Sequence, residues 1–142
     1  MKNIQTLFGD VSYDPGKAIR FPEGLIGFES LRDFIVMPHK NDDFIYCFQS
    51  LEQPHVVFLL VDPALFFPDY QVPVGRTVRK KLGIEPEDPF FILTTITFHR
   101  ENKITLNLLA PVVYSPKSNN AVQIVLDGSD YTTKTELPLQ TN

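Results

Sequence analysis

The sequence has little cysteine and lacks any long apolar run. Its single cysteine, Cys47, leaves no partner for an internal disulfide. Its longest apolar run covers residues 56–61, far below the roughly 18 residues of a membrane-spanning helix. The first residues, MKNIQTLFGDVSYD, do not combine a charged start with a following apolar stretch, as a secretion signal does. We therefore expect a cytoplasmic protein that does not associate with membranes.

Grouped glycines and an excess of positive charge are also missing. The seven glycines are dispersed, so the sequence has no GxGxxG or GxxxxGK loop to cradle a phosphate. The chain has 13 Lys and Arg against 17 Asp and Glu, a net charge of −4. Because binding to a nucleic-acid backbone normally needs a cationic excess, we expect no direct nucleic-acid binding. Acidic residues outnumber basic ones two to one within residues 1–70.

Residue types that carry catalysis or bind metals are present but scattered. His39, His55 and His99 are too far apart for a local metal motif, and no cysteine pair accompanies them. Ser50 lacks the flanking glycines of a nucleophile elbow. Cys47 lies between aromatic residues of an apolar segment, where a thiol usually acts as a small buried hydrophobe. We predict no catalytic residue, no metal site and no bound cofactor.

Proline spacing indicates short strands. The chain has twelve prolines, which stop helices, and the intervals between them are rich in Val, Ile, Thr, Phe and Tyr. Alternation over residues 90–98 and 104–110 predicts an antiparallel hairpin. Residues 56–61 do not alternate, which predicts a central strand covered on both faces. The other predicted strands are 4–8, 18–21, 34–37, 44–49, 112–114 and 122–126.

One segment has a convincing helical pattern. Val74, Val78 and Leu82 recur at helical spacing, and Gly83 is suited to end the helix. The pattern predicts a short amphipathic helix over residues 74–82.

A weaker pattern predicts a helical turn over residues 29–33.

Many short strands in a chain of this length create unpaired edges, which closure of the sheet removes. We predict a single domain over residues 1–142 with a loose tail at residues 137–142. Its fold is mainly β, a small barrel-like arrangement of antiparallel strands with one short helix.

Four stretches, in order along the chain, resemble the successive motifs of the FliW flagellar assembly factor family. They are residues 21–29 (FPEGLIGFE), 49–50 (QS), 62–70 (DP followed by FPDY) and 107–113 (NLLAPVV). The resemblance spans nearly the whole chain. Ile26 departs from it, because the family's turn often has proline there.

The resemblance implies a non-enzymatic regulator with two protein partners, flagellin and the RNA-binding translational repressor CsrA. Similar proteins bind CsrA and relieve its repression of flagellin translation, and flagellin competes by sequestering them. An acidic protein suits such a partner, because CsrA must present basic surface to RNA.

The resemblance also directs attention to two segments that combine apolar and acidic side chains. We expect the charged partner contacts to be Glu23, Glu29, Asp33 and Asp69. We expect the apolar anchors to be Leu25, Phe28, Phe67 and Tyr70. Burial within the domain is the alternative for the apolar residues. The alternative function is a small-molecule-binding or hydrolytic β-barrel protein, because barrel interiors can hold one ligand.

Overall fold

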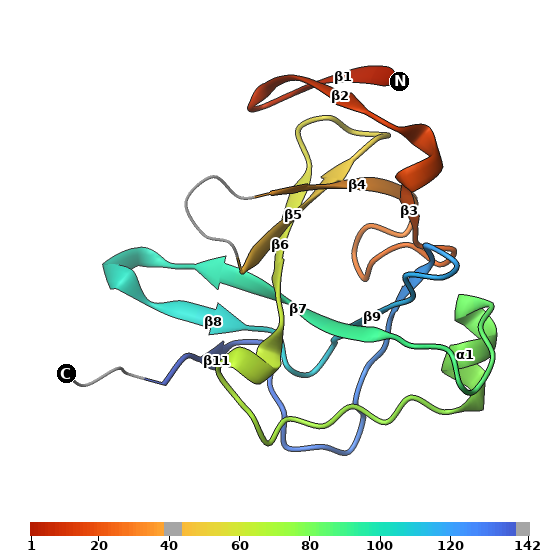
Figure 1. Cartoon of the computed structure of the whole chain (residues 1–142). Helices are drawn as coiled ribbons and strands as arrows, with labels where there is room; N and C mark the ends of the chain where they lie inside the picture. The colour runs from red at the N-terminus through yellow and green to blue at the C-terminus, as the bar shows by residue number, and fades with distance from the viewer. Residues whose placement is uncertain (39–43, 139–142) are drawn as a thin grey trace.

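The computed structural model describes residues 1–38 and 44–138 (Figure 1). The strands of this part of the chain are β1 (Lys2–Thr6), β2 (Gly9–Tyr13), β3 (Ile19–Arg20), β4 (Asp33–Pro38), β5 (Ile45–Ser50), β6 (Val57–Val61), β7 (Phe91–Phe98), β8 (Ile104–Leu106), β9 (Val112–Tyr114), β10 (Ala121–Gln123) and β11 (Thr135–Glu136). The helical elements are the 3-10 turns η1 (Pro15–Lys17), η2 (Pro63–Leu65) and η3 (Arg100–Asn102) and the α-helix α1 (Arg76–Leu82). The prediction of a mainly β fold with one short helix is confirmed for the described residues.

Most strands belong to one antiparallel sheet that curls on itself (Figure 1). The strand order is β10-β9-β7-β6-β5-β4-β3, and β8 pairs with both β7 and β11. The two ends of the sheet meet where the Arg20 amide donates to the Asn119 carbonyl at 2.9 Å. Because this contact covers part of both edges, the sheet is barrel-like, as expected. The position of β6 between β5 and β7 confirms the predicted central strand.

Aromatic side chains fill the inside of the curl. Phe34 is fully buried, and its ring centroid lies 5.3 Å from that of Phe21. Phe21 also contacts Phe48 edge-on, with 6.3 Å between the two ring centroids. The buried members of this first cluster are Ile19, Phe21, Leu25, Leu31, Phe34, Phe48, Leu60, Leu93, Val112 and Ala121. Segments from both halves of the chain therefore share one core.

Two smaller clusters flank the first. The second lies beneath the β7–β8 hairpin, with Ile45, Val61, Ile96, Leu106 and Leu108 as its buried members. The third lies beneath α1 and has Leu82, Ile84, Val113 and Val122 as its buried members. Gly83 ends α1 in the left-handed region at φ 71°, and its N–H donates to the Arg79 and Lys80 carbonyls. The predicted helix is confirmed from Arg76 to Leu82.

The N-terminal segment differs from its prediction. The strand expected at residues 4–8 lies at Lys2–Thr6 and turns back through Leu7 and Phe8 into β2, forming a separate two-stranded sheet. Thr6 Oγ1 donates to the Gly9 carbonyl at 2.8 Å, and Gly9 has φ +98°. The sequence GDVSY was not predicted as a strand because glycine, aspartate and serine favour turns.

The predicted helical turn at residues 29–33 is wrong. The N–H groups of Arg32 and Asp33 donate to the Glu52 carboxylate at 3.0 and 3.1 Å, and β4 already begins at Asp33. A side chain distant in sequence therefore satisfies these donors without helix formation.

The strand predicted over residues 104–110 ends at Leu106 because of a turn. Asn107 Oδ1 accepts the Ala110 N–H at 3.0 Å, which is a local alternative to strand pairing.

The predicted loose tail over residues 137–142 does not hold for Leu137, its first residue. Leu137 packs against the second cluster, and its N–H donates to the Ile104 carbonyl at 3.1 Å. Residues 139–142, which the prediction also included, lie outside the described residues.

Within residues 1–38 and 44–138, no helix has both the length and the apolar character needed to cross a membrane.

The tip of the β7–β8 hairpin holds Glu101 in the left-handed region, at φ 64° and ψ 30°. This conformation costs a side-chain-bearing residue about 1 kcal/mol and costs glycine almost nothing. We expect Glu101→Gly to raise the free energy of unfolding by about 0.5 kcal/mol, because relief of strain outweighs the added freedom of the unfolded chain. Urea denaturation measures the difference. Arg100→Gly is the control, because Arg100 does not have positive φ, and it should destabilise the protein. A Glu101→Gly variant less stable than the parent would contradict the prediction.

Candidate partner-binding surfaces

The first candidate surface is a compact turn formed by residues 21–33, called the glycine turn below. Gly24 has φ +71°, and a Cβ at this position would lie 2.5 Å from the Glu29 Cα. The chain therefore crosses itself too closely for any side chain at Gly24. Leu25 and Phe28 form an isolated antiparallel bridge, with the Phe28 N–H donating to the Leu25 carbonyl at 2.7 Å. Gly24 thus allows this segment to form a compact turn in which the backbone passes close to itself.

The apolar residues of the glycine turn divide between core and surface. Leu25 is 4% exposed and belongs to the first cluster, so its expected role as a partner anchor is corrected: the side chain is occupied within the domain. Phe28 is 41% exposed and contacts Phe58 edge-on at 5.0 Å. Ile26, which the sequence analysis did not select, is 55% exposed, and its N–H donates to Gln123 Oε1 at 2.8 Å. Ile26 and Phe28 are the apolar side chains that this turn presents.

The carboxylates of the glycine turn interact within the chain. Glu23 pairs with Lys81 at 3.2 Å, and Asp33 lies 3.7 Å from Arg20. Glu29 Oε1 accepts a backbone N–H of the same turn at 3.2 Å. Exposed ion pairs of this kind add little stability, but each cation offsets one negative charge. The acidic character of the surface is therefore weaker than its sequence indicates.

The second candidate surface is the loop over residues 62–72, called the tyrosine loop below. Phe67 is half-buried against the second cluster. The Tyr70 hydroxyl donates to the Leu108 carbonyl at 2.6 Å. Burial, together with the neighbouring Tyr131, raises the pKa of Tyr70 above its ordinary value of 10. Asp69 is exposed. Phe67 and Tyr70 thus attach the loop to the domain, and Asp69 faces solvent.

Residues 127–131 lie against the tyrosine loop. The Tyr131 ring centroid is 4.7 Å from that of Tyr70, with the rings at 73°. The Tyr131 hydroxyl accepts the Gln71 N–H at 3.4 Å. These contacts join segments that are 60 residues apart in sequence. We call the two segments the acidic loop pair.

Two carboxylates of the acidic loop pair were missed by sequence reasoning. Asp127 and Asp130 are exposed, and neither side chain has a hydrogen-bond or ion-pair partner among the described residues. Together with Asp69 they place three negative charges on neighbouring loops. The DGSD composition indicates only a turn. No local signal connects it to the tyrosine loop.

The structure does not bring the two sets of predicted contact residues together. In Figure 1 the orange glycine turn lies beside the blue segment between β9 and β10. The 3-10 turn η2, at the start of the tyrosine loop, contacts β7 instead. The two segments also pack on different clusters. The protein therefore has two separate candidate surfaces.

An open hollow of about 650 Å³ lies between the tyrosine loop and the curled sheet. Its lining residues are Ile19, Val36, Tyr46, Phe48, Asp62, Pro63, Ala64, Tyr70, Val72, Phe90, Phe91, Ile92, Leu93 and Tyr114. The lining is mainly apolar, and Val36, Tyr46 and Phe91 are exposed in it. Its one charged residue, Asp62, caps η2 by accepting the Ala64 N–H at 3.0 Å. The volume falls within the range of small-molecule sites, roughly 300–1,000 Å³.

Ser50 and His99 have hydrogen-bond partners within the domain, and Cys47 is buried. Ser50 Oγ accepts the N–H groups of Glu52 and Gln53 at 3.2 and 3.0 Å, which stabilises the turn after β5. Cys47 is buried, and burial raises the pKa of its thiol. His99 Nε2 lies 2.8 Å from Thr105 Oγ1. Within the part of the chain that the structure describes, no three His, Cys, Asp or Glu side chains are grouped to hold a metal. His39 lies outside the described residues.

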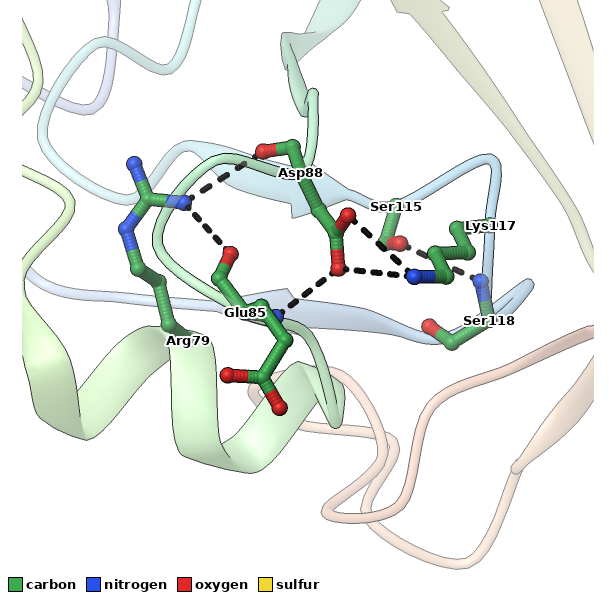
Figure 2. A network of polar contacts seen from close by, with 6 residues as sticks. All are labelled: Arg79, Glu85, Asp88, Ser115, Lys117 and Ser118. Carbon is green, nitrogen blue, oxygen red and sulfur yellow. Dashed lines mark hydrogen bonds and ion pairs between the residues drawn. The ribbon is translucent and has the colours of Figure 1, made fainter.

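A polar network joins the loop after α1 to the loop after β9 (Figure 2). Asp88 Oδ2 accepts the Glu85 N–H at 2.8 Å, and Lys117 Nζ donates to both Asp88 oxygens at 3.3 Å. The Arg79 guanidinium donates to the Glu85 and Asp88 carbonyls, each at 3.4 Å, and lies over the Phe90 ring at 5.1 Å. These contacts hold the two loops together.

The network gives a pH-dependent prediction. The Glu85 N–H and then Lys117 lower the pKa of Asp88 below its ordinary value of 3.8. A lowered folded-state pKa stabilises the protein above the unfolded pKa, and this contribution disappears as pH falls through the folded pKa. We expect Asp88→Asn to lower Tm at pH 7 and the difference from the parent to shrink below about pH 4. Calorimetric scans across this range measure it, and a gap that widens on acidification would contradict it.

Comparison with known proteins identifies the family. The family model described as FliW protein matches residues 2–137. The chain is 46% identical to flagellar assembly factor FliW 2 of Desulfotalea psychrophila over 138 residues, covering 97% of this chain and 91% of that protein. It is also 46% identical to flagellar assembly factor FliW of Syntrophotalea carbinolica over 137 residues, covering 96% and 98% of the two chains.

A solved structure agrees with these sequence relatives. A crystal structure of the flagellar assembly factor FliW superposes with a TM-score of 0.88 at 26% identity, covering 97% of this chain and 98% of that one. The resemblance carried by the four sequence motifs is thereby confirmed. The chain belongs to the FliW family of flagellar assembly factors.

Proposed function

We propose that this flagellar assembly factor acts by partner switching in the cytoplasm. It binds the translational repressor CsrA and relieves repression of flagellin translation. Flagellin competes for it and so restores repression when unassembled flagellin accumulates. The observation that carries this proposal is the family match over residues 2–137.

The surface chemistry supports a binding role in place of catalysis. Ile26 and Phe28 are exposed on a turn that Gly24 holds in one shape, so little side-chain and loop entropy is lost on binding. Asp69, Asp127 and Asp130 add exposed negative charge for a basic partner. Of the residues first selected as contacts, Glu23, Phe28, Glu29, Asp33 and Asp69 remain proposed contacts, whereas Phe67 and Tyr70 are proposed to support the loop that carries Asp69.

Calorimetric titration tests the proposal. The protein is titrated with CsrA and with flagellin from the same organism, and each titration should give a Kd below tens of micromolar, a binding free energy of about −6 kcal/mol or better. Flagellin added to the preformed CsrA complex should then release CsrA. Absence of binding to both partners would remove the proposal.

The open hollow favours a second candidate function, small-molecule binding. Its volume of about 650 Å³ and its apolar lining with a few polar groups fit a drug-sized ligand. A ligand at 100 times its Kd would add about 2.7 kcal/mol to the free energy of unfolding. A thermal-shift screen with metabolites detects such a ligand, and Phe91→Ser should abolish the shift. Failure of every metabolite to raise Tm would remove this candidate.

A further inference from the structure

The open hollow ends on the buried core. Ile19, Phe48 and Leu93 line it and are also buried members of the first cluster. The remaining lining residues come from the tyrosine loop, from β4, β5, β7 and β9, and from Phe90 just before β7. A concave site of about 650 Å³ with an apolar floor suits a small molecule, because such a site covers most of the ligand's surface.

Aromatic rings make up much of the lining. Six of the fourteen lining residues are aromatic: Tyr46, Phe48, Tyr70, Phe90, Phe91 and Tyr114. The Tyr70 hydroxyl donates to the Leu108 carbonyl at 2.6 Å. The Tyr114 hydroxyl donates to Asn119 Oδ1 at 3.0 Å. Because both hydroxyl protons are used within the domain, these two side chains mainly offer their rings to a ligand. The faces of aromatic rings carry partial negative charge and attract cations.

The charge of the lining has one sign. Asp62 is exposed, and its Oδ1 accepts the Ala64 N–H at 3.0 Å, which leaves the carboxylate further acceptor capacity. Among the described residues that line the hollow, none is Lys, Arg or His. No cation of the described residues lies within 4.0 Å of the Asp62 carboxylate. A ligand carboxylate or phosphate would therefore meet negative charge in the hollow and no counter-charge.

Two of the rings are accessible to a ligand. Tyr46 and Phe91 line the hollow and are exposed. Phe90 differs from them, because the Arg79 guanidinium already lies over its ring at 5.1 Å. Exposed rings together with one carboxylate favour a positively charged ligand that also has apolar surface.

We propose that the open hollow binds a small organic cation, a molecule that carries an ammonium group on an apolar body. This inference rests on the second candidate function, small-molecule binding, and adds the chemical class of the ligand. The ammonium group pairs with the Asp62 carboxylate, and the apolar body packs against the aromatic lining. The full negative charge and the ring faces both select the cation over a neutral molecule of the same shape.

Three indole compounds that differ in one group test the inference. Tryptamine carries an ammonium group, tryptophol a hydroxyl group and indole-3-acetate a carboxylate. Each is titrated into the full chain labelled with nitrogen-15, and amide chemical shifts are followed by NMR. Tryptamine should bind with a Kd of about 1 mM or lower and at least about fivefold more tightly than tryptophol. Indole-3-acetate should bind most weakly, and the largest shifts should fall on lining residues.

Asp62→Asn removes the charge and keeps an oxygen that can accept the Ala64 N–H. We expect the affinity for tryptamine to fall to that for tryptophol, whose own affinity stays unchanged. Asp69→Asn is the matched control, because Asp69 is an exposed carboxylate of the same loop that does not line the hollow. It should alter the affinity for tryptamine by less than about twofold, since exposed charges at a distance are screened. Circular dichroism checks folding, and Asp62→Ser, which can also cap η2, replaces Asp62→Asn if that variant is unfolded.

The outcomes separate this inference from the functions proposed above. Equal affinities for tryptamine and tryptophol in the hollow would overturn the cationic class and leave small-molecule binding standing. Shifts confined to residues outside the hollow, or no binding of any of the three compounds, would overturn the inference. A preference for tryptamine that survives Asp62→Asn, or that Asp69→Asn reduces equally, would overturn it as well. Partner switching is decided separately by the titrations with CsrA and flagellin, and small-molecule binding by the metabolite screen.

Discussion

Gly24→Ala is expected to lower the free energy of unfolding by about 3 kcal/mol, through backbone strain and overpacking together. Gly24 has φ +71°, where a Cβ is strained whatever space surrounds it. The added Cβ would also lie 2.5 Å from the Cα and the carbonyl oxygen of Glu29. These are backbone atoms, so no side-chain rotation relieves the contact. Urea denaturation followed by circular dichroism measures the loss.

Gly27→Ala is the matched control in the same turn. Gly27 has φ +87°, but its Cβ would meet nothing within 4 Å. Strain alone applies, and the expected loss is about 1 kcal/mol. Equal losses at the two glycines would show that the close approach between Gly24 and Glu29 adds no cost. A Gly24→Ala variant that remains folded should also bind partners less tightly if the glycine turn contributes contacts, because Ile26 and Phe28 must move with it.

The elements predicted well from sequence are those whose determinants are local. The helix at Arg76–Leu82 was predicted from apolar spacing and from Gly83, which ends it in the structure. The β7–β8 hairpin was predicted from alternation in two neighbouring segments. Each of these signals lies within one short stretch of the sequence, so no knowledge of the rest of the fold was needed.

The elements predicted poorly depend on contacts between distant segments. The donors of Arg32 and Asp33 are satisfied by Glu52, which replaces the helical turn expected from local pattern. The acidic loop pair exists because Tyr70 and Tyr131 pack together. Neither contact leaves a periodic trace in the sequence, because periodicity reports only the environment along one element. The candidate site was therefore predicted as separate residues, and their grouping required the structure.

The different burial of the neighbouring residues Leu25 and Ile26 was also not predictable from periodicity. Two adjacent apolar residues in a glycine-rich turn have no strand or helix period to assign them to a face. The bridge between Leu25 and Phe28 determines which side chain is buried. It directs Leu25 into the first cluster and leaves Ile26 exposed.

The difference in burial between Leu25 and Ile26 predicts a large loss of stability when Leu25 is truncated. Leu25→Ala should lower the free energy of unfolding by about 2–5 kcal/mol, because it removes a buried side chain and leaves a cavity in the first cluster. The transition midpoint in urea should fall while its slope stays constant. If Leu25 were a surface anchor, the change would be within about 0.5 kcal/mol.

Ile26→Ala, one residue away, completes the comparison. Ile26 is 55% exposed against 4% for Leu25, so its truncation should change the free energy of unfolding by no more than about 0.5 kcal/mol. Any weakening of partner binding by Ile26→Ala then reports a direct contact, because the folded population is unchanged. Weakening by Leu25→Ala must instead be corrected for unfolded protein before it is compared. Similar stability losses in the two variants would contradict the placement of Leu25 in the core and of Ile26 on the surface.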